Sequence, residues 1–381
     1  MKSAMMPPVG AELDTLHELR WEVRSFLQDQ LATRRFFPRV DNWLTSWDPD
    51  FTRELGRRGW LGMVIPTEYG GQGRTFLERF VVTEELLAAG APVAAHWIAE
   101  RQIGPSLLRF GTESQKQAFL PEISKGEILF GIGMSEPESG SDLASVRTRA
   151  DKVDGGWRLS GTKVWTSGAH LADAFIALAR SEPFDTERRQ AGLSQFIVDL
   201  HAPGVQVRPI LSMAGDHHFN EVHLDGVFVP DDRLFGTAGN GWAQVTSELG
   251  FERSGPERFL STWVLLAEAA DAVAGGTLPC EPGLGRYVAR VAALHQMSFA
   301  VSMALESERD ADTAAAVVKI LGTTTEGDIA DHVDALAANG TFDERMETLL
   351  SSAVTQRPGF TIRGGTNEIL RGVIARGLGI R

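Results

Sequence analysis

The sequence predicts an α+β protein of several domains, with a β domain of sheet or barrel type between two helical parts. Apolar residues recur at helical spacing between positions 12 and 119, and short alternating runs separated by turn residues follow. From Gly241 the helical pattern returns and holds to the end. We therefore predict three domains, over residues 1–129, 130–238 and 239–381.

The N-terminal part shows clear helix signals. Apolar side chains lie on one face of the first predicted helix, with charges between them: Leu13, Leu16, Leu19, Val23 and Phe26. A short helix is expected over 50–59, and the helical pattern resumes over 80–88. Thr112 precedes another helix and is a good N-cap, because its hydroxyl can accept a bond from a free N–H of the first turn.

The middle part reads as strands joined by turns. The segment Val153–Trp157, with two adjacent glycines, predicts a hairpin turn, and residues 158–165 return from it as a strand. Further strands are expected at regular spacing over 173–179, 194–200, 205–210 and 220–229.

The C-terminal part predicts a helical bundle, because its heptads are not sustained enough for a free coiled coil. A Gly- and Pro-containing break separates the second and third of its helices, near residues 274–283. The expected helices span 242–250, 258–274, 284–308, 311–338 and 342–355.

Composition narrows the functional class. The chain has 381 residues, 43% of them hydrophobic, which is ample for a large core, and a net charge of −13 from 37 basic and 50 acidic residues. An acidic chain without a run of basic residues is expected to bind nucleic acid and anionic membranes poorly. The lone cysteine, Cys280, excludes an intrachain disulfide and fits a reducing cytoplasm. No signal peptide, membrane-spanning stretch or metal-ligand motif is expected.

The stretch from Gly131 to Asp142, GIGMSEPESGSD, is the first candidate site. Its small residues let the backbone approach a flat or anionic group, and the hydroxyls of Ser135 and Ser141 can bind a phosphate or the acceptor edge of a ring. The alternative is a tight turn between a helix and a strand, and the stretch alone does not decide between them.

Three further stretches carry chemistry, each with a plainer alternative. KVWTSG at 163–168 can lay an indole against a planar ring, or it is a core Trp before a turn. IRGGTNEILR at 362–371 can form an anion site at a helix N-terminus, or a simple Thr N-cap. LGFER at 249–253 places Glu252 after an apolar stretch, as a base or as a surface carboxylate paired with a nearby Arg.

Taken together, these stretches resemble the acyl-CoA dehydrogenase family of flavoproteins. The similar segments run in the family's order over nearly the whole chain: MSEPESGSD at 134–142, GTKVWTS at 161–167, EVHLDGVFVP at 221–230 and GGT at 364–366. The resemblance implies an N-terminal helical domain, a middle β domain and a C-terminal four-helix domain, which agrees with the order of elements above.

The resemblance also implies that FAD is the cofactor, bound between the β domain and the C-terminal helices. Ser135 corresponds to a residue at the flavin pyrimidine edge, Ser141 to a pyrophosphate contact, and Trp165 to the Trp beside the isoalloxazine. Ser167 replaces a Thr that bonds flavin N5. The full cofactor-binding set implied is Met134, Ser135, Gly140, Ser141, Trp165, Thr166, Ser167, Thr366 and Glu368.

The implied reaction is α,β-dehydrogenation of an acyl-CoA thioester to the trans-2-enoyl-CoA. A base removes the α-proton while the β-hydrogen leaves as hydride to flavin N5. Many members carry the base as Glu where this chain has Gly364, and a minority place it on an earlier helix at the position of Glu252. We therefore expect Glu252 to be the base, with Glu257 the next candidate, and the Gly364 N–H to help bind the thioester oxygen.

A second departure from the family concerns the partner chain. The Arg-x-Phe-Gly segment and the later Gly-Gly-x-Gly segment, which contact FAD in relatives, are missing between 279 and 305 and between 345 and 357. In a homodimer each FAD would miss these contacts, so a different subunit that supplies them is the economical explanation, as in heterotetrameric actinobacterial sterol-degrading members. A homo-oligomer (dimer or tetramer) stays the alternative. Electron-transferring flavoprotein is the expected acceptor, and a bulky, steroid-derived acyl-CoA the expected substrate. The alternatives are a non-catalytic companion subunit and an acyl-CoA oxidase.

Overall fold

The computed structural model describes residues 14–253, 255–279, 281–307, 309–337 and 342–380. Cys280 lies outside them, as do the side chains at 14 and 248–252. The chain forms two compact units. The first consists of Met1–Trp47, Arg74–Val93 and Gly250–Arg381, and the second of Asp48–Gly73 and Ala94–Leu249.

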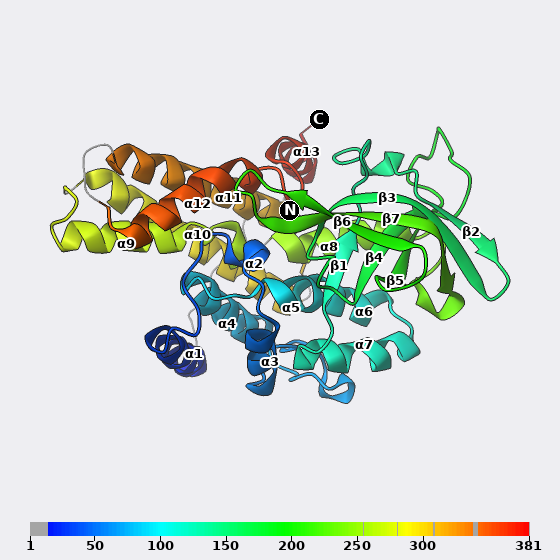
Figure 1. The fold of residues 1–381 in the computed structure, drawn as a ribbon, viewed down its shortest axis with the longest axis horizontal. Helices are drawn as coiled ribbons and strands as arrows, with labels where there is room; N and C mark the ends of the chain where they lie inside the picture. The colour runs from blue at the N-terminus through cyan, green and yellow to red at the C-terminus, as the bar shows by residue number, and fades with distance from the viewer. Residues whose placement is uncertain (1–13, 254, 280, 308, 338–341, 381) are drawn as a thin grey trace. The chain divides into compact units, whose positions relative to one another are not determined.

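The first unit is helical. Its long helices pack side by side, with α11 against α10, α12 and α13, and α4 against α1 and α10 (Figure 1). Thr75 caps α4 with a capping box, and Asp343 caps α12. The elements of this unit are α1 (Asp14–Ala32), α2 (Asn42–Thr45), α4 (Phe76–Ala88), η5 (Pro256–Arg258), α9 (Trp263–Ala274), α10 (Pro282–Glu306), α11 (Asp312–Ala337), α12 (Glu344–Phe360) and α13 (Asn367–Gly377).

The helix expected over 258–274 is broken, which corrects the prediction. The chain forms the short turn η5, and α9 begins only at Trp263. The backbone of Ser261 serves other elements: its N–H donates to the Glu326 carboxylate at 2.8 Å and its carbonyl accepts from the Asp41 N–H at 2.9 Å. Tertiary hydrogen bonds therefore replace the helical ones at this point.

The second unit combines helices with a sheet. Thr112 caps α7 through a capping box with Gln115, as predicted. The helical elements are α3 (Pro49–Arg57), η1 (Thr67–Tyr69), α5 (Ala94–Ile98), the π-helical turn η2 (Ala99–Ile103), α6 (Gly104–Phe110), α7 (Glu113–Lys125), η3 (Leu143–Ser145), η4 (Asp231–Arg233) and α8 (Gly241–Arg253), which continues into the first unit.

The sheet has eight strands and mixed directions. Its order is β6-β7-β3-β2-β4-β5-β8, with β1 parallel to β4, and it is drawn mainly in green in Figure 1. The β2–β3 hairpin turns at Asp154–Gly155, as the sequence predicts. The strands are β1 (Phe130–Gly133), β2 (Arg149–Val153), β3 (Gly156–Ser167), β4 (Ala174–Arg180), β5 (Leu193–Asp199), β6 (Val205–Leu211), β7 (His217–Pro230) and β8 (Leu234–Phe235).

The strand β1 corrects the interpretation of Gly131–Gly133 as loop residues. An added Cβ at Gly133 would lie 2.4 Å from the Phe175 ring, and one at Gly131 would lie 3.2 Å from Thr166. These glycines therefore let β1 pack closely inside the unit, next to the core that α6, α7, β1 and β4 share. Only the residues after Gly133 remain candidates for close approach of the backbone to a flat or anionic group.

By length and composition, α10 is one described helix that could cross a membrane, which the sequence analysis did not anticipate. Of its most apolar window, 44% is buried inside the protein. Core helices of soluble proteins meet the same criterion, so the observation is weak evidence for a membrane span.

Candidate functional site

The end of β3 forms a strained, aromatic surface in the second unit. The pairing of β3 with β7 has an irregularity between Lys163 and Thr166, and Trp165 there has a φ of 61°. A left-handed backbone is costly for a bulky residue and is found where surrounding contacts enforce it, often at functional sites. The Trp165 side chain is 57% exposed and packs edge-on against Phe219. We name the segment Trp165–Ser167 the β3 wall.

The loop after β1 lies directly beside the β3 wall. The Val164 N–H donates to the Ser135 carbonyl at 2.9 Å, so Met134 and Ser135 are held against the end of β3. The loop then turns through reciprocal backbone bonds between Glu136 and Ser139. This turn leaves Gly140 and Ser141 exposed. The structure therefore brings the predicted loop residues and the β3 wall into one surface.

A buried ion pair joins the loop to the strand. Lys163 is fully buried, and its Nζ donates to Glu136 Oε1 at 2.7 Å and to the Met134 carbonyl at 3.2 Å. Glu136 also accepts from the backbone N–H groups of Arg147 and Thr148, at 2.6 and 2.9 Å. The ion pair therefore holds both Met134 and the segment that leads into β2, through Lys163 on one side and Glu136 on the other.

Both partners of this pair titrate abnormally. Burial opposes ionisation of Glu136, but the charge of Lys163 and the hydrogen bonds outweigh it, so the pKa of the carboxyl is lowered. Burial lowers the pKa of Lys163 to about 8, against the opposing attraction of Glu136. At neutral pH both groups are charged.

The residues around the β3 wall fit a flavin. Within the described residues, the hydroxyls of Ser135, Ser141 and Ser167 form no hydrogen bond to protein, and the buried Thr166 Oγ1 has no partner. A Cβ on Gly140 would meet nothing within 4 Å. A planar ring with a polar edge can pack on the exposed indole, while serine hydroxyls without a protein partner can bind its edge. The space around Gly140 allows a close approach of the ligand to the backbone.

The turn before α13 carries the remaining predicted residues, in the first unit. Gly364 and Gly365 have φ values of 66° and 87°, and Thr366 caps α13 by accepting from the Ile369 N–H at 3.3 Å. The Thr N-cap interpretation is therefore confirmed as geometry. Glu368 is exposed in the first turn of the helix.

Buried cations hold the carbonyls of this turn. Lys319, fully buried on α11, donates to the carbonyls of Thr361 and Gly365 at 3.1 and 2.8 Å and to Asn367 Oδ1 at 2.9 Å. Arg253 Nε donates to the Gly364 carbonyl at 3.2 Å. Since the carbonyls bind these cations, the backbone conformation of the two glycines is fixed from inside the unit.

Arg363, next to Gly364, enters a buried charged cluster. Its guanidinium donates to Asp41 and to Ser261 Oγ and lies 4.6 Å from the centre of the Trp43 ring. Glu326 is fully buried beside it, and its Oε2 has no partner within the described residues. Burial raises the pKa of Glu326 to about 7, although Arg363 and Ser261 oppose the shift.

Glu326 should make the stability of the chain pH-dependent. The native carboxyl keeps a proton that the unfolded chain releases between about pH 4.5 and 7, so stability falls as the pH rises through this window. Glu326→Gln should remove this slope, worth roughly 2–3 kcal/mol between pH 5 and 8. Urea unfolding at several pH values measures it, with the exposed Glu347→Gln as control. An unchanged slope in Glu326→Gln would contradict the assignment.

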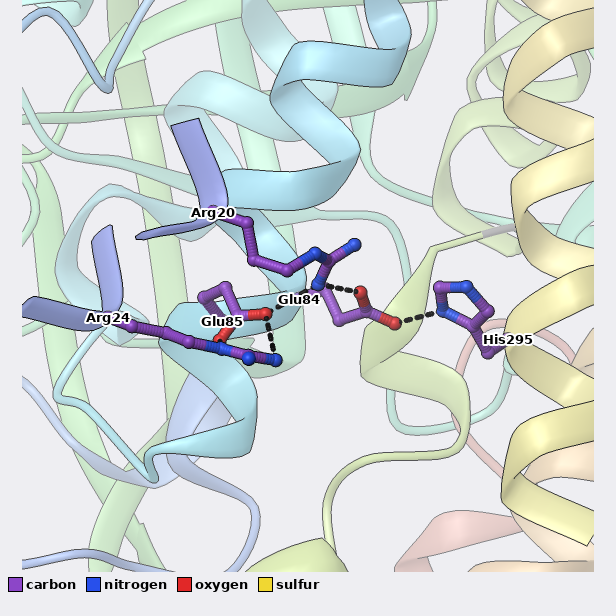
Figure 2. Close-up of polar contacts among 5 residues, drawn as sticks. All are labelled: Arg20, Arg24, Glu84, Glu85 and His295. Atoms are coloured by element: carbon purple, nitrogen blue, oxygen red, sulfur yellow. Dashed lines mark hydrogen bonds and ion pairs between the residues drawn. The ribbon is translucent and has the colours of Figure 1, made fainter. Parts of the chain in front are cut away.

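A second polar cluster lies between α1, α4 and α10 of the first unit (Figure 2). Arg20 bonds both Glu84 and Glu85, Arg24 bonds Glu85, and Glu84 also meets His295. Burial opposes ionisation of Glu84, but these partners lower its pKa overall. The cluster borders a groove of about 530 Å³. The arginines of this cluster pair with its glutamates. These ion pairs link α1 to α4, and the contact of Glu84 with His295 links α4 to α10.

Sequence reasoning found part of this arrangement and missed part. Met134, Ser135 and the β3 wall lie together, while Gly364, Thr366 and Glu368 share one turn of the other unit. The side chain of Glu252 lies outside the described residues, although its backbone belongs to α8. The supporting roles of Lys163 and Lys319 were missed. A lysine within an apolar pattern was the available signal.

The fold and the β3 wall fit a flavoprotein dehydrogenase, and the comparisons identify the family. The chain matches the N-terminal domain of acyl-CoA dehydrogenases over residues 14–127, the middle domain over 131–227 and the C-terminal domain over 282–379. It belongs to the acyl-CoA dehydrogenase family, whose members are oxidoreductases that generally bind FAD.

Individual relatives support this membership. The chain is 34% identical to the acyl-CoA dehydrogenase FadE29 of Mycobacterium tuberculosis, over 85% of this chain and 86% of that protein. It is 41% identical to FadE34 of the same organism over 52% of this chain. The matched region covers only 27% of FadE34.

Solved structures are similar over almost the whole chain. The "Tcur3481-Tcur3483 steroid ACAD" has a TM-score of 0.86 at 30% identity and covers 97% of this chain and 99% of that one. The ChsE4-ChsE5 complex from Mycobacterium tuberculosis has a TM-score of 0.79 at 26% identity and covers 97% and 99%.

Proposed function

We propose that this chain dehydrogenates an acyl-CoA at its α,β-bond, with Glu252 as the base and FAD against the β3 wall. The observation that carries the proposal is the wall itself: a strained, exposed Trp165 beside uncommitted hydroxyls. Bound FAD would supply the redox chemistry by accepting the β-hydrogen as hydride.

The residues of the chain would divide the remaining work. Ser135 and Ser167 would offer their hydroxyls to the flavin edge, Met134 and the buried Thr166 could contribute only backbone groups, and Gly140 and Ser141 would approach its phosphates. Gly364 has no side chain to act as a base, so the α-proton would go to Glu252. The Gly364 N–H would stabilise the thioester oxygen as negative charge develops on it.

The substrate and the assembly are further parts of the proposal. A structural neighbour is titled a steroid ACAD, which supports a steroid-derived acyl-CoA. Another neighbour is a complex of two different chains, which supports a partner subunit that completes the flavin contacts. We propose electron-transferring flavoprotein as the acceptor.

Replacing the proposed base gives the direct test. Glu252→Gln should retain bound FAD and lose at least about 1,000-fold in turnover, because the amide cannot accept the α-proton. Glu248→Gln, on the same helix, removes a similar charge and should remain active. The assay follows anaerobic bleaching of the flavin by steroid acyl-CoAs, with the chain alone and with candidate partner subunits.

Other outcomes of this assay point to the alternatives. Near-normal turnover of Glu252→Gln would move the base to Glu257. A flavin that no acyl-CoA bleaches would indicate a companion subunit, and release of hydrogen peroxide without an added acceptor would indicate an oxidase. Full, tight FAD occupancy of the chain purified alone would refute the need for a different partner.

A further inference from the structure

The conformation of Trp165 must be enforced by neighbouring groups. A left-handed backbone costs a bulky residue roughly 1–3 kcal/mol, so hydrogen bonds on either side have to hold it. The N–H of Val164 is held by Ser135, and the N–H of Gly168 donates to the His218 carbonyl at 2.7 Å. The carbonyl of Thr166, between these points, is held by a side chain of β7.

That side chain is Asn220, which is fully buried in β7 between β3 and β6. Its Nδ2 donates to the Thr166 carbonyl at 3.0 Å and lies 3.2 Å from His170 Nδ1. Its Oδ1 lies 2.8 Å from His217 Nε2. The same nitrogen lies 3.5 Å from the His218 carbonyl. A carbonyl can only accept, so the amide nitrogen must face Thr166, and the roles of the bonds to the two histidines follow.

The two histidines form a stacked pair over this amide. Their ring centres are 3.9 Å apart, with 21° between the planes. His170 accepts at Nδ1 and His217 donates from Nε2, so Asn220 uses both amide hydrogens and its oxygen. Partial burial of the ring, with the charge of His217 as the next cause, lowers the pKa of His170, which favours the neutral ring that accepts this bond.

We propose that Asn220 is the positioning residue of the β3 wall, held in place by His170 and His217. It fixes the Thr166 carbonyl and so keeps Trp165 and Ser167 in the conformation that receives the flavin. This inference rests on the proposed function in its link to FAD, whereas the effect on the wall itself does not need a flavin.

Asn220→Asp separates this role from packing. The change is nearly isosteric, but a carboxylate has no N–H and places an acceptor against the Thr166 carbonyl and His170 Nδ1. Amide exchange across 164–168 in the flavin-free protein should accelerate at least about tenfold, because the bond to the Thr166 carbonyl is lost together with the bond to His170. The dissociation constant for FAD should rise by at least about the same factor, with a shift of the visible flavin band.

Thr162→Val is the matched control. Thr162 Oγ1 lies 3.0 Å from His223 Nδ1, so this variant loses one bond between β3 and β7, but none to the β3 wall. Exchange across 164–168 and FAD affinity should stay within about twofold of the unchanged chain. Equal effects of the two variants would overturn the inference, as would unchanged exchange in Asn220→Asp.

His170→Phe keeps a ring on His217 while it removes the Nδ1 acceptor, and it serves if Asn220→Asp does not fold. His170 is exposed, so this variant should fold, with exchange across 164–168 accelerated about threefold. Exchange at the original rate would overturn the inference. An unmodified chain that takes up no FAD, alone or with partners, would refute the proposed function and leave the exchange result to decide the role of Asn220.

Discussion

Replacing Lys163 by methionine should lower the free energy of unfolding by about 3–5 kcal/mol, the cost of leaving one member of a buried ion pair without its partner. The Glu136 carboxylate, whose side chain is 7% exposed, would keep its two backbone donors but would lose Lys163, the only cation bonded to it among the described residues. The Met134 carbonyl would lose its donor as well. Urea denaturation of the full chain measures the loss.

The same substitution at the surface is the control. Lys152→Met removes a lysine of β2 that pairs with Asp231, and both side chains are about half exposed. Exposed pairs of this kind contribute about 0–1 kcal/mol. If Lys152→Met and Lys163→Met lower the free energy of unfolding by similar amounts, the buried pair does not stabilise the protein more than an exposed one.

A double variant tests the mechanism of the loss. Lys163→Met with Glu136→Leu removes both charges, so it should recover part of the stability. Recovery should be incomplete, because the N–H groups of Arg147 and Thr148 would then lack their acceptor. A double variant less stable than Lys163→Met alone would argue against an uncompensated charge as the cause.

The order of elements was predictable because it depends on local periodicity. The strands after residue 156 lie where turn residues bound short apolar or alternating runs, and two helices begin where Thr112 and Thr366 can cap them. The strand β1 was missed because its glycines carry no alternation of side chains. The break before Trp263 was missed because its cause is the distant Glu326, 65 residues from Ser261.

The candidate site divides in the same way. Ser135, Trp165 and Ser167 could be proposed from the sequence because their side-chain chemistry points to a ring and short motifs contain them, and their contact with a flavin stays a prediction. Asn220 was not, because it lies 54 residues from the Thr166 carbonyl that it binds. A buried polar side chain becomes informative only when its partners are known. The residues that hold a site are therefore harder to predict than those that touch a ligand.

Replacing Lys319 by methionine should cost at least about 3 kcal/mol, because three buried acceptors lose a charged donor together. These acceptors are the carbonyls of Thr361 and Gly365 and the side-chain oxygen of Asn367. They surround Gly364 and Gly365, whose left-handed backbone the ammonium helps to hold. Urea denaturation measures the stability, and amide exchange across 361–368 should accelerate strongly.

Thr323→Val, one turn further along α11, is the matched control for Lys319→Met. The Thr323 hydroxyl lies 3.3 Å from the same Asn367 oxygen and 2.8 Å from the Lys319 carbonyl, so it contributes only neutral bonds. Its loss should cost under about 1.5 kcal/mol and leave exchange in the turn nearly unchanged. If the Gly364 N–H binds the thioester oxygen, Lys319→Met should also lower turnover more than FAD affinity. If Lys319 has only a structural role, turnover and FAD affinity should both fall in proportion to the loss of folded protein.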